Sequence, residues 1–306
     1  MKHSIKIVII LLGMFFLTQL IGILVIHQYS PEVKQVVNEQ GILENKTIYN
    51  LPYGMEPPPD ITPSTTLFSI VLAMAIAVVF MLILMRYKVE FFLRAWFFVV
   101  VALALGITIY AFISGVKYAQ IIALIIALPL AAIKLFKRNI IVHNITELFI
   151  YPGIAAILVP LLNIWTVVIL LVLISIYDIY AVWRAGFMQK MAQYQISKLK
   201  FFTGFFVPYL GKKEKKLIKQ AKESNEKDKK IKVNVAILGG GDVIFPIILA
   251  GVVLNQLGII PALIISVGAT LALAFLFYIS KKGKFYPAMP FISAGCFLAL
   301  GIALLI

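Results

Sequence analysis

The chain has 306 residues, of which 62% are hydrophobic, and its mean hydropathy is +1.00. Soluble domains are about 45–50% apolar, so this composition excludes an ordinary soluble protein and indicates an integral membrane protein. The formal net charge of +15 does not indicate a nucleic-acid-binding protein, because the basic residues are distributed as in the loops of a membrane protein.

A membrane-spanning helix needs about 20 mostly apolar residues, and nine stretches of this chain meet that condition. Backbone polar groups in lipid must find partners within the chain, so we expect nine helices and an all-α fold. The first stretch resembles a signal peptide, but its apolar core is longer than the usual about 7–15 residues, so we expect a retained helix. The predicted spans cover roughly residues 5–26, 66–85, 95–114, 118–134, 145–162, 163–183, 233–255, 258–280 and 285–306.

The distribution of lysine and arginine predicts the orientation, because these residues collect in cytoplasmic loops. With the N-terminus inside, the cytoplasmic segments hold 25 of the 28 basic residues. One of these segments is "KLFKR", which begins at Lys134. The outer segments hold only Lys34, Lys46 and Lys117. We therefore expect a multi-pass protein of the cell membrane with a cytoplasmic N-terminus and an extracytoplasmic C-terminus.

Residues 184–232 carry 14 basic and four acidic residues and divide the chain into two membrane parts. We expect a six-span part over residues 1–183, a basic cytoplasmic loop over 184–232, and a three-span part over 233–306. Early in the loop, "RAGFMQKMAQYQISKLK" has helical spacing that predicts an extension of the sixth helix or a helix on the membrane surface. Further on, "KKEKKLIKQAKESNEKDKKIK" predicts a mobile, solvated connector.

Ionisable side chains within membrane spans are rare and are candidates for function. Three acids qualify, namely Glu147, Asp178 and Asp242. Glu147 has a structural interpretation, because Asn144 precedes it at the spacing of a helix N-terminal capping box. His143, one turn earlier, could also pair with Glu147.

Asp178 and Asp242 fall in the cytoplasmic half of two consecutive antiparallel spans, so their carboxyl groups can meet. Like charges held close together do not both ionise readily, so such a pair would share a proton. It could hold a water molecule between a general base and a general acid, as amide hydrolysis requires. Three glycines, 239–241, precede Asp242 and would let the backbone bend and admit a substrate. The structural alternative is tight helix packing at the glycines and one buried hydrogen bond from Asp242.

Three motifs resemble those of the presenilin and signal peptide peptidase family of GxGD intramembrane aspartyl proteases. They are "YD" at Tyr177–Asp178, "GGGD" at Gly239–Asp242, and "PAMP" at Pro287–Pro290, where the family usually has Pro-Ala-Leu-Pro. Methionine in place of leucine preserves volume and apolarity. The motifs lie in the expected order on the sixth, seventh and ninth spans, so together they are more specific than any one of them.

The resemblance implies a presenilin-like fold of nine transmembrane helices, and the predicted orientation is that of presenilins rather than of signal peptide peptidases. It implies an endopeptidase with Asp178 and Asp242 as its catalytic pair, without a metal or organic cofactor. Its partners would be transmembrane-helix or signal-peptide substrates within the lipid bilayer, and not nucleic acid. The chain is similar to a minimal, single-subunit archaeal or bacterial relative, and the apolar loop "FFTGFFVPYL" (201–210) is similar to the presenilin segment that undergoes self-cleavage. Substrate-binding or supporting roles are implied for Tyr177, Leu238, Gly239, Gly240, Gly241, Pro287, Ala288, Met289 and Pro290.

A proton- or ion-coupled transporter or leak channel is the alternative function, because membrane carboxylates relay protons and glycine-broken helices form binding sites. The two membrane parts show no internal repeat, which favours the protease. A structural scaffold is a third interpretation. The histidines are His3, His27 and His143, which do not form the H-E-x-x-H motif of a zinc protease.

Overall fold

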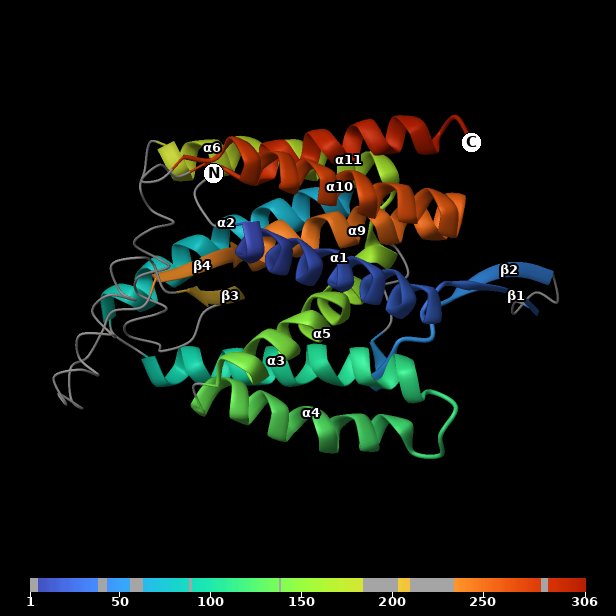
Figure 1. The fold of residues 1–306 in the computed structure, drawn as a ribbon. Helices are drawn as coiled ribbons and strands as arrows, with labels where there is room; N and C mark the ends of the chain where they lie inside the picture. Colours follow the sequence, from blue (N-terminus) through green and yellow to red (C-terminus); the bar gives the residue numbers. More distant parts are fainter. Residues whose placement is uncertain are drawn as a thin grey trace, which may run out of the picture.

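The computed structural model describes residues 5–37, 43–55, 63–87, 90–137, 139–183, 203–209, 234–281 and 286–306. Most of them are helical, and two antiparallel hairpins complete the fold (Figure 1). The predicted surface helix and the mobile connector between residues 184 and 232 lie outside the described residues. The helices are α1 (Ile5–Gln28), α2 (Pro63–Tyr87), α3 (Glu90–Ile113), α4 (Ala119–Phe136), α5 (Ile140–Leu158), α6 (Ile164–Trp183), α9 (Gly240–Leu257), α10 (Ile259–Ile279) and α11 (Met289–Ala303).

Each predicted span overlaps one of these helices. Within the described residues, seven helices are long and apolar enough to cross a membrane, namely α1, α3, α4, α5 with the following 3-10 turn η2 (Val159–Leu161), α6, α9 and α10. The apolar part of α2, Thr65–Ala77, and α11 are shorter. The protein is therefore a multi-pass, mostly helical membrane protein.

The seventh predicted span is not helical throughout. Its first residues form β4 (Asn234–Gly239), which pairs antiparallel with β3 (Gly204–Tyr209), and α9 begins only at Gly240. The expectation of a continuous helix is therefore wrong over residues 234–239, and the expectation of a loop is wrong over residues 204–209. The two strands satisfy each other's backbone groups, so this part of the span needs no helix.

A second hairpin, of β1 (Glu32–Val37) and β2 (Leu43–Ile48), lies in the connection between α1 and α2. The following 3-10 turn η1 (Pro52–Gly54) is tied to the helices, because the Tyr53 hydroxyl donates to the Gln120 carbonyl oxygen at 3.2 Å. The two hairpins lie at opposite ends of the helix bundle, and the C-terminus lies at the end of β1 and β2 (Figure 1).

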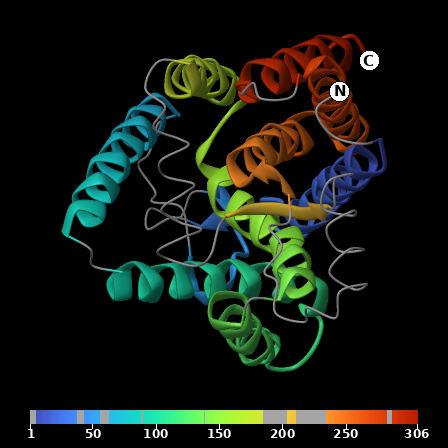
Figure 2. The ribbon, with the colours of Figure 1, turned by 60° about the vertical axis from the view of Figure 1, so that its left-hand side comes forward.

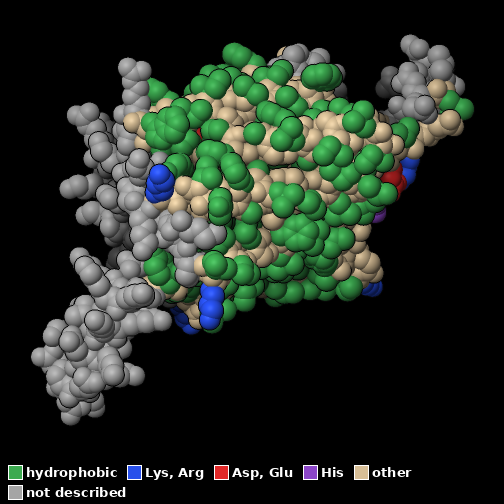
Figure 3. Space-filling model, turned by 45° about the horizontal axis from the view of Figure 1, so that its top comes forward, with side chains coloured by type: hydrophobic (Ala, Val, Ile, Leu, Met, Phe, Trp, Pro, Cys, Tyr) green, Lys and Arg blue, Asp and Glu red, His purple; other side chains and the backbone are tan. Residues whose placement is uncertain are grey.

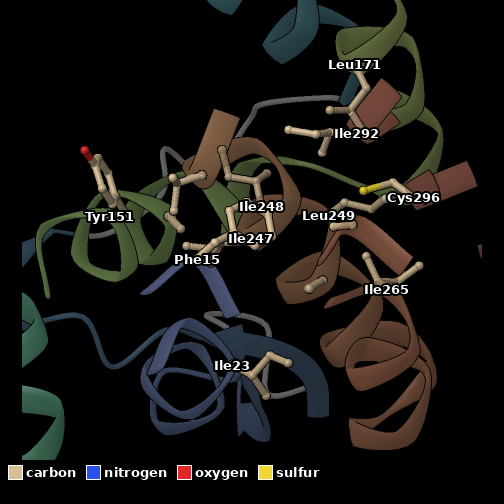
Figure 4. Close-up of a cluster of buried hydrophobic side chains, with 14 of the residues drawn as sticks. Phe15, Ile23, Tyr151, Leu171, Ile247, Ile248, Leu249, Ile265, Ile292 and Cys296 are labelled. Carbon is tan, nitrogen blue, oxygen red and sulfur yellow. The ribbon is translucent and has the colours of Figure 1, made fainter. Parts of the chain in front are cut away.

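Helix α9 lies at the centre of the bundle, where α1, α5, α6, α10 and α11 surround it (Figure 2). Its residues Ile247–Leu249 are fully buried and pack with Phe15 of α1, Ile265 of α10 and Cys296 of α11 (Figure 4). A helix that is apolar on all sides and enclosed by others provides a rigid support for the residues at its start.

Large hydrophobic side chains also cover the outside of the bundle. Trp165 is 77% exposed and Phe91 is 85% exposed. On the face shown in Figure 3, hydrophobic side chains cover most of the surface, and lysine and arginine side chains lie towards its two ends. A soluble protein does not expose an apolar surface of this extent, whereas lipid tails solvate it.

Candidate active site

Helix α6 carries Asp178 on its buried face. The helix begins with a reciprocal cap in which Thr166 N–H donates to the Asn163 side-chain oxygen and Asn163 N–H donates to the Thr166 hydroxyl oxygen, both at 2.9 Å. Ile174, Asp178 and Ala181 follow at spacings of three or four residues and are buried. The spacing therefore directs the carboxylate into the bundle rather than towards lipid.

The start of α11 holds the Asp178 carboxylate. Met289 N–H donates to Asp178 Oδ2 at 3.0 Å, and Ala288 N–H donates to the same carboxylate. The first N–H groups of a helix have no partner within the helix, so a carboxylate from another helix can accept from them. One turn away, the hydroxyls of Ser175 and Ser293 lie 3.0 Å apart and join α6 to α11.

Asp242 lies in the first turn of α9, directly after β4. Gly239 is the N-cap residue, with extended backbone angles, and Asp242 is the third helical residue. The Asp242 carboxylate accepts from the backbone N–H of Gly239, which is the N3-to-N-cap half of a capping box. A Cβ atom at position 239 would lie 3.2 Å from Asp242 Oδ2, tighter than an ordinary contact. The strand-to-helix junction thus sets the direction of the carboxylate.

The second glycine of the motif is required by close packing. A Cβ atom at Gly240 would lie 2.7 Å from the hydroxyl oxygen of Tyr151 on α5. At Gly241 the nearest atom, on Phe245, would be 3.9 Å away, so position 241 has room for a side chain. Pro246 lacks an N–H, so the Asp242 carbonyl receives no intrahelical bond from it.

The two aspartates come together between α6 and α9. The helices are in contact, and the carboxyl groups lie close enough to interact electrostatically. Asp178 is 5% exposed and Asp242 is half-buried. Two carboxyl groups from separate parts of the chain therefore lie within electrostatic range of each other inside the bundle, and each accepts from backbone N–H groups at the start of a helix.

The residues to which the family resemblance gives a supporting role differ in burial. Leu238 on β4 is 3% exposed and packs in the core, and Met289 is also buried. Pro287 is buried and Pro290 is half-buried, on either side of the two N–H groups that bind Asp178. Tyr177 is 39% exposed, so part of its side chain faces out of the bundle, whereas Asp178 is buried.

The predicted capping box on α5 is wrong. The helix begins at Ile140, and Asn139 is its N-cap, accepting from Ile141 N–H and Val142 N–H. Asn144 and Glu147 therefore lie inside the helix. Asn144 and Glu147 have the spacing of a capping box, but the helix starts five residues before Asn144, at Asn139.

The bundle also holds a buried cation that the sequence patterns did not predict. Lys134, expected in a cytoplasmic loop, lies in the last turn of α4 and is 5% exposed. Its Nζ forms an ion pair with Glu147 Oε1 at 2.5 Å. The expected neighbour His143 is also present, with Nε2 3.5 Å from Glu147 Oε1. The apolar "LAAIKLF" around Lys134 was the available signal, since a lysine inside such a stretch requires a partner.

Three motifs that are distant in the sequence thus meet at one place, namely the buried face of α6, the start of α9 and the start of α11. Within the described residues, no three histidine, cysteine, aspartate or glutamate side chains cluster in a way that could hold a metal ion.

The sequence from residue 44 to residue 306 matches the family model described as signal-peptide peptidase, presenilin aspartyl protease. Among solved structures, the chain is similar to a presenilin family intramembrane aspartate protease in two crystal forms. In the C222 form the TM-score is 0.61 and the identity 19%, over 97% of this chain and 98% of the other. In the P2 form the TM-score is 0.59 and the identity 19%, over 96% of each chain. No curated protein sequence matches the chain.

The solved structures establish the same fold over nearly the whole chain, and the family model covers both aspartates and the start of α11. The enzyme class follows from the family, and the apolar helices agree with catalysis inside a membrane. The chain belongs to the signal-peptide peptidase and presenilin family of intramembrane aspartyl proteases.

Proposed function

We propose that Asp178 and Asp242 are the catalytic pair and that they hydrolyse peptide bonds within membrane-spanning segments by activating one water molecule. The observation that carries this proposal is that the contact of α6 with α9 brings the carboxyl groups of Asp178 and Asp242 within electrostatic range of each other. One carboxylate acts as general base towards the water, and the other carboxyl group, protonated, donates to the scissile carbonyl oxygen. The pair titrates as a unit, so the two roles exchange during turnover.

The oriented backbone groups support this assignment. Met289 N–H holds Asp178 and Gly239 N–H holds Asp242, so neither carboxylate has to reorganise before reaction. Such fixed polar groups are most effective where water is otherwise excluded. This chemistry needs no metal or organic cofactor.

The substrate has to be extended before cleavage, because the carbonyls of a helix are hydrogen-bonded and shielded. The backbone N–H and C=O groups of Gly204 and Phe206 on β3 point away from β4 and bind side chains of α5. In an antiparallel pair, the residues directly opposite such residues also point their backbone groups outward. On β4 these outward-pointing residues are Val235, Ile237 and Gly239. Within the described residues, no segment pairs with this outer edge of β4.

We infer that an unwound stretch of a transmembrane helix or signal peptide adds to this edge as a third strand. The edge ends at Gly239, three residues before Asp242. The scissile carbonyl would then lie between the edge and the turn at Pro287–Pro290. Family membership agrees with substrates that are embedded in the bilayer.

We also propose the orientation with a cytoplasmic N-terminus and an extracytoplasmic C-terminus, in the cell membrane. The asymmetric distribution of basic residues supports it. With it we propose a division into a six-helix part over residues 1–183, a basic loop over 184–232 and a three-helix part over 233–306.

The test is cleavage of a single-span peptide by the purified protein in liposomes, with fragments identified by mass spectrometry. Wild type is expected to produce defined fragments, and Asp178→Asn and Asp242→Asn, each alone, are expected to produce none. Cleavage by both variants at the wild-type rate would overturn the assignment.

A matched flux measurement with the same liposomes separates the alternative function. A transporter or leak channel that uses the same carboxylates would move ions or protons without producing fragments. A protease is expected to produce fragments without an accompanying ion flux.

A further inference from the structure

A buried polar cluster on α4 and α5 lies beside the candidate active site and takes no part in the proposed chemistry. It consists of Lys134, His143 and Glu147, which are 5%, 8% and 1% exposed, and of the half-buried Asn144. Charged groups are costly to bury, and replacing a buried ion pair by apolar residues is often neutral or stabilising. Fold stability alone is therefore a weak explanation for this cluster.

The cluster binds the outer edge of β3. His143 Nε2 lies 2.8 Å from the Gly204 carbonyl oxygen, so this nitrogen donates, since a carbonyl only accepts. Nδ1 of the same ring then accepts from Lys134 Nζ at 3.3 Å. Gly204 N–H donates to Glu147 Oε1 at 3.4 Å. Both backbone groups of Gly204 are therefore held by side chains of α5.

Asn144 holds the next outward-facing residue of the same strand. Its side-chain nitrogen donates to the Phe206 carbonyl oxygen at 2.7 Å, and its side-chain oxygen accepts from Phe206 N–H at 2.9 Å. An amide that pairs with both groups of a backbone residue imitates a neighbouring strand. The side chains of α5 thus replace a third strand along β3 and fix its position.

The strand in turn sets the position of the candidate catalytic aspartate. Gly204 is the register partner of Gly239, and Gly240 N–H donates to the Thr203 carbonyl oxygen at 3.3 Å. Gly239 N–H binds the Asp242 carboxylate. A continuous series of contacts therefore runs from Lys134 through Glu147 and Gly204 to Asp242.

We propose that Glu147, held by Lys134, is a positioning residue that places the β3–β4 hairpin, and through it Asp242, for catalysis. The proposal rests on the proposed function of Asp242. It assigns to the α4–α5 ion pair an effect on turnover that acts through the backbone of Gly204, separate from any effect on folding.

Two matched double variants test it. Lys134→Met/Glu147→Gln and Lys134→Met/Glu147→Leu both remove the buried charges and keep similar volumes. Glutamine retains an oxygen that accepts from Gly204 N–H, whereas leucine does not. Because a displacement of about 1 Å can cost about 100-fold in rate, we expect kcat to fall about 10- to 100-fold in the leucine variant relative to the glutamine variant. KM and melting temperature are expected to be similar in the two.

Hydrogen exchange gives a readout that does not depend on activity. Amides of β3 and β4 are expected to exchange faster in the leucine variant and at close to the wild-type rate in the glutamine variant. Equal kcat in the two variants, or equal exchange, would overturn the positioning role. If wild type itself cleaves nothing, the proposed function fails, and the exchange comparison still decides whether Glu147 holds the hairpin.

Discussion

Met289 N–H donates to Asp178 Oδ2 at 3.0 Å, across 111 residues of sequence. The two prolines of the "PAMP" turn place the donor at the start of α11, where no residue of the same helix competes for it. The turn therefore does more than begin a helix, because it orients a carboxylate on α6. This contact gives the third motif a physical connection to the first.

Removing this donor is expected to lower turnover more than stability. Met289→Pro deletes the N–H at the first helical position, where proline is frequent. Ala288 before it has helical backbone angles, which a following proline disfavours, so unfolding is measured together with the rates. Met289→Leu keeps the N–H and the apolar volume and serves as the control. We expect kcat for peptide cleavage to fall about 10- to 100-fold in the proline variant and to change little in the leucine variant. Equal rates would show that the contact does not orient Asp178 for reaction.

The glycines before Asp242 are expected to differ in their tolerance of alanine. Gly240→Ala places a methyl group against the Tyr151 hydroxyl, and overpacking of this kind costs about 1–3 kcal/mol. Gly241→Ala meets no close atom and lies within a helix, where alanine is favoured. Thermal unfolding in detergent should show a lower melting temperature for the first variant only. A similar decrease in both would contradict the packing described for Tyr151.

The two asparagines of α5 are expected to have separable effects. Asn139→Ala removes the N-cap and should lower the unfolding free energy by about 1 kcal/mol without changing kcat. Asn144→Ala removes both bonds to Phe206 and should lower kcat, because β3 loses part of its support. Unfolding curves and cleavage rates of the two variants provide the measurement. Reduced kcat in Asn139→Ala at unchanged stability would reverse the assignment.

The proposed orientation can be measured by cysteine labelling, because the single native cysteine, Cys296, is buried. Val33 in β1 is 67% exposed, and Lys281 after α10 is also exposed. A membrane-impermeant maleimide should label Val33→Cys in intact cells and Lys281→Cys only after the membrane is opened. The reverse pattern would show that the protein is inserted with its N-terminus outside.

Hydropathy was sufficient to find a helix in every predicted span, because burial in lipid requires about the same apolar length each time. It failed at residues 234–239, where a strand replaces the first turns of the expected helix. An apolar run is compatible with a helix or a buried strand, and the choice depends on whether a partner strand is present. Here the partner, β3, comes from a segment that follows a different helix.

The electrostatic partners of buried charged residues were likewise not predictable from local sequence. The sequence identifies Glu147 as an intramembrane acid, but local spacing alone predicts a capping role for it that the structure does not show. Its actual partner Lys134 lies on the preceding helix, and its other contact is a backbone group of β3. Which side chains meet across two helices depends on their packing, which sequence spacing within one helix does not specify.

The amino-acid sequence by itself determined that the chain is helical and membrane-embedded and that it carries two aspartates in matching spans, because apolar length and local motifs are properties of neighbouring residues. Only the tertiary structure decided that Asp178 is held by Met289, that Asp242 follows a paired strand, and that Lys134 and Glu147 support that strand. These contacts join residues far apart in the chain, so they exist only once the helices have packed.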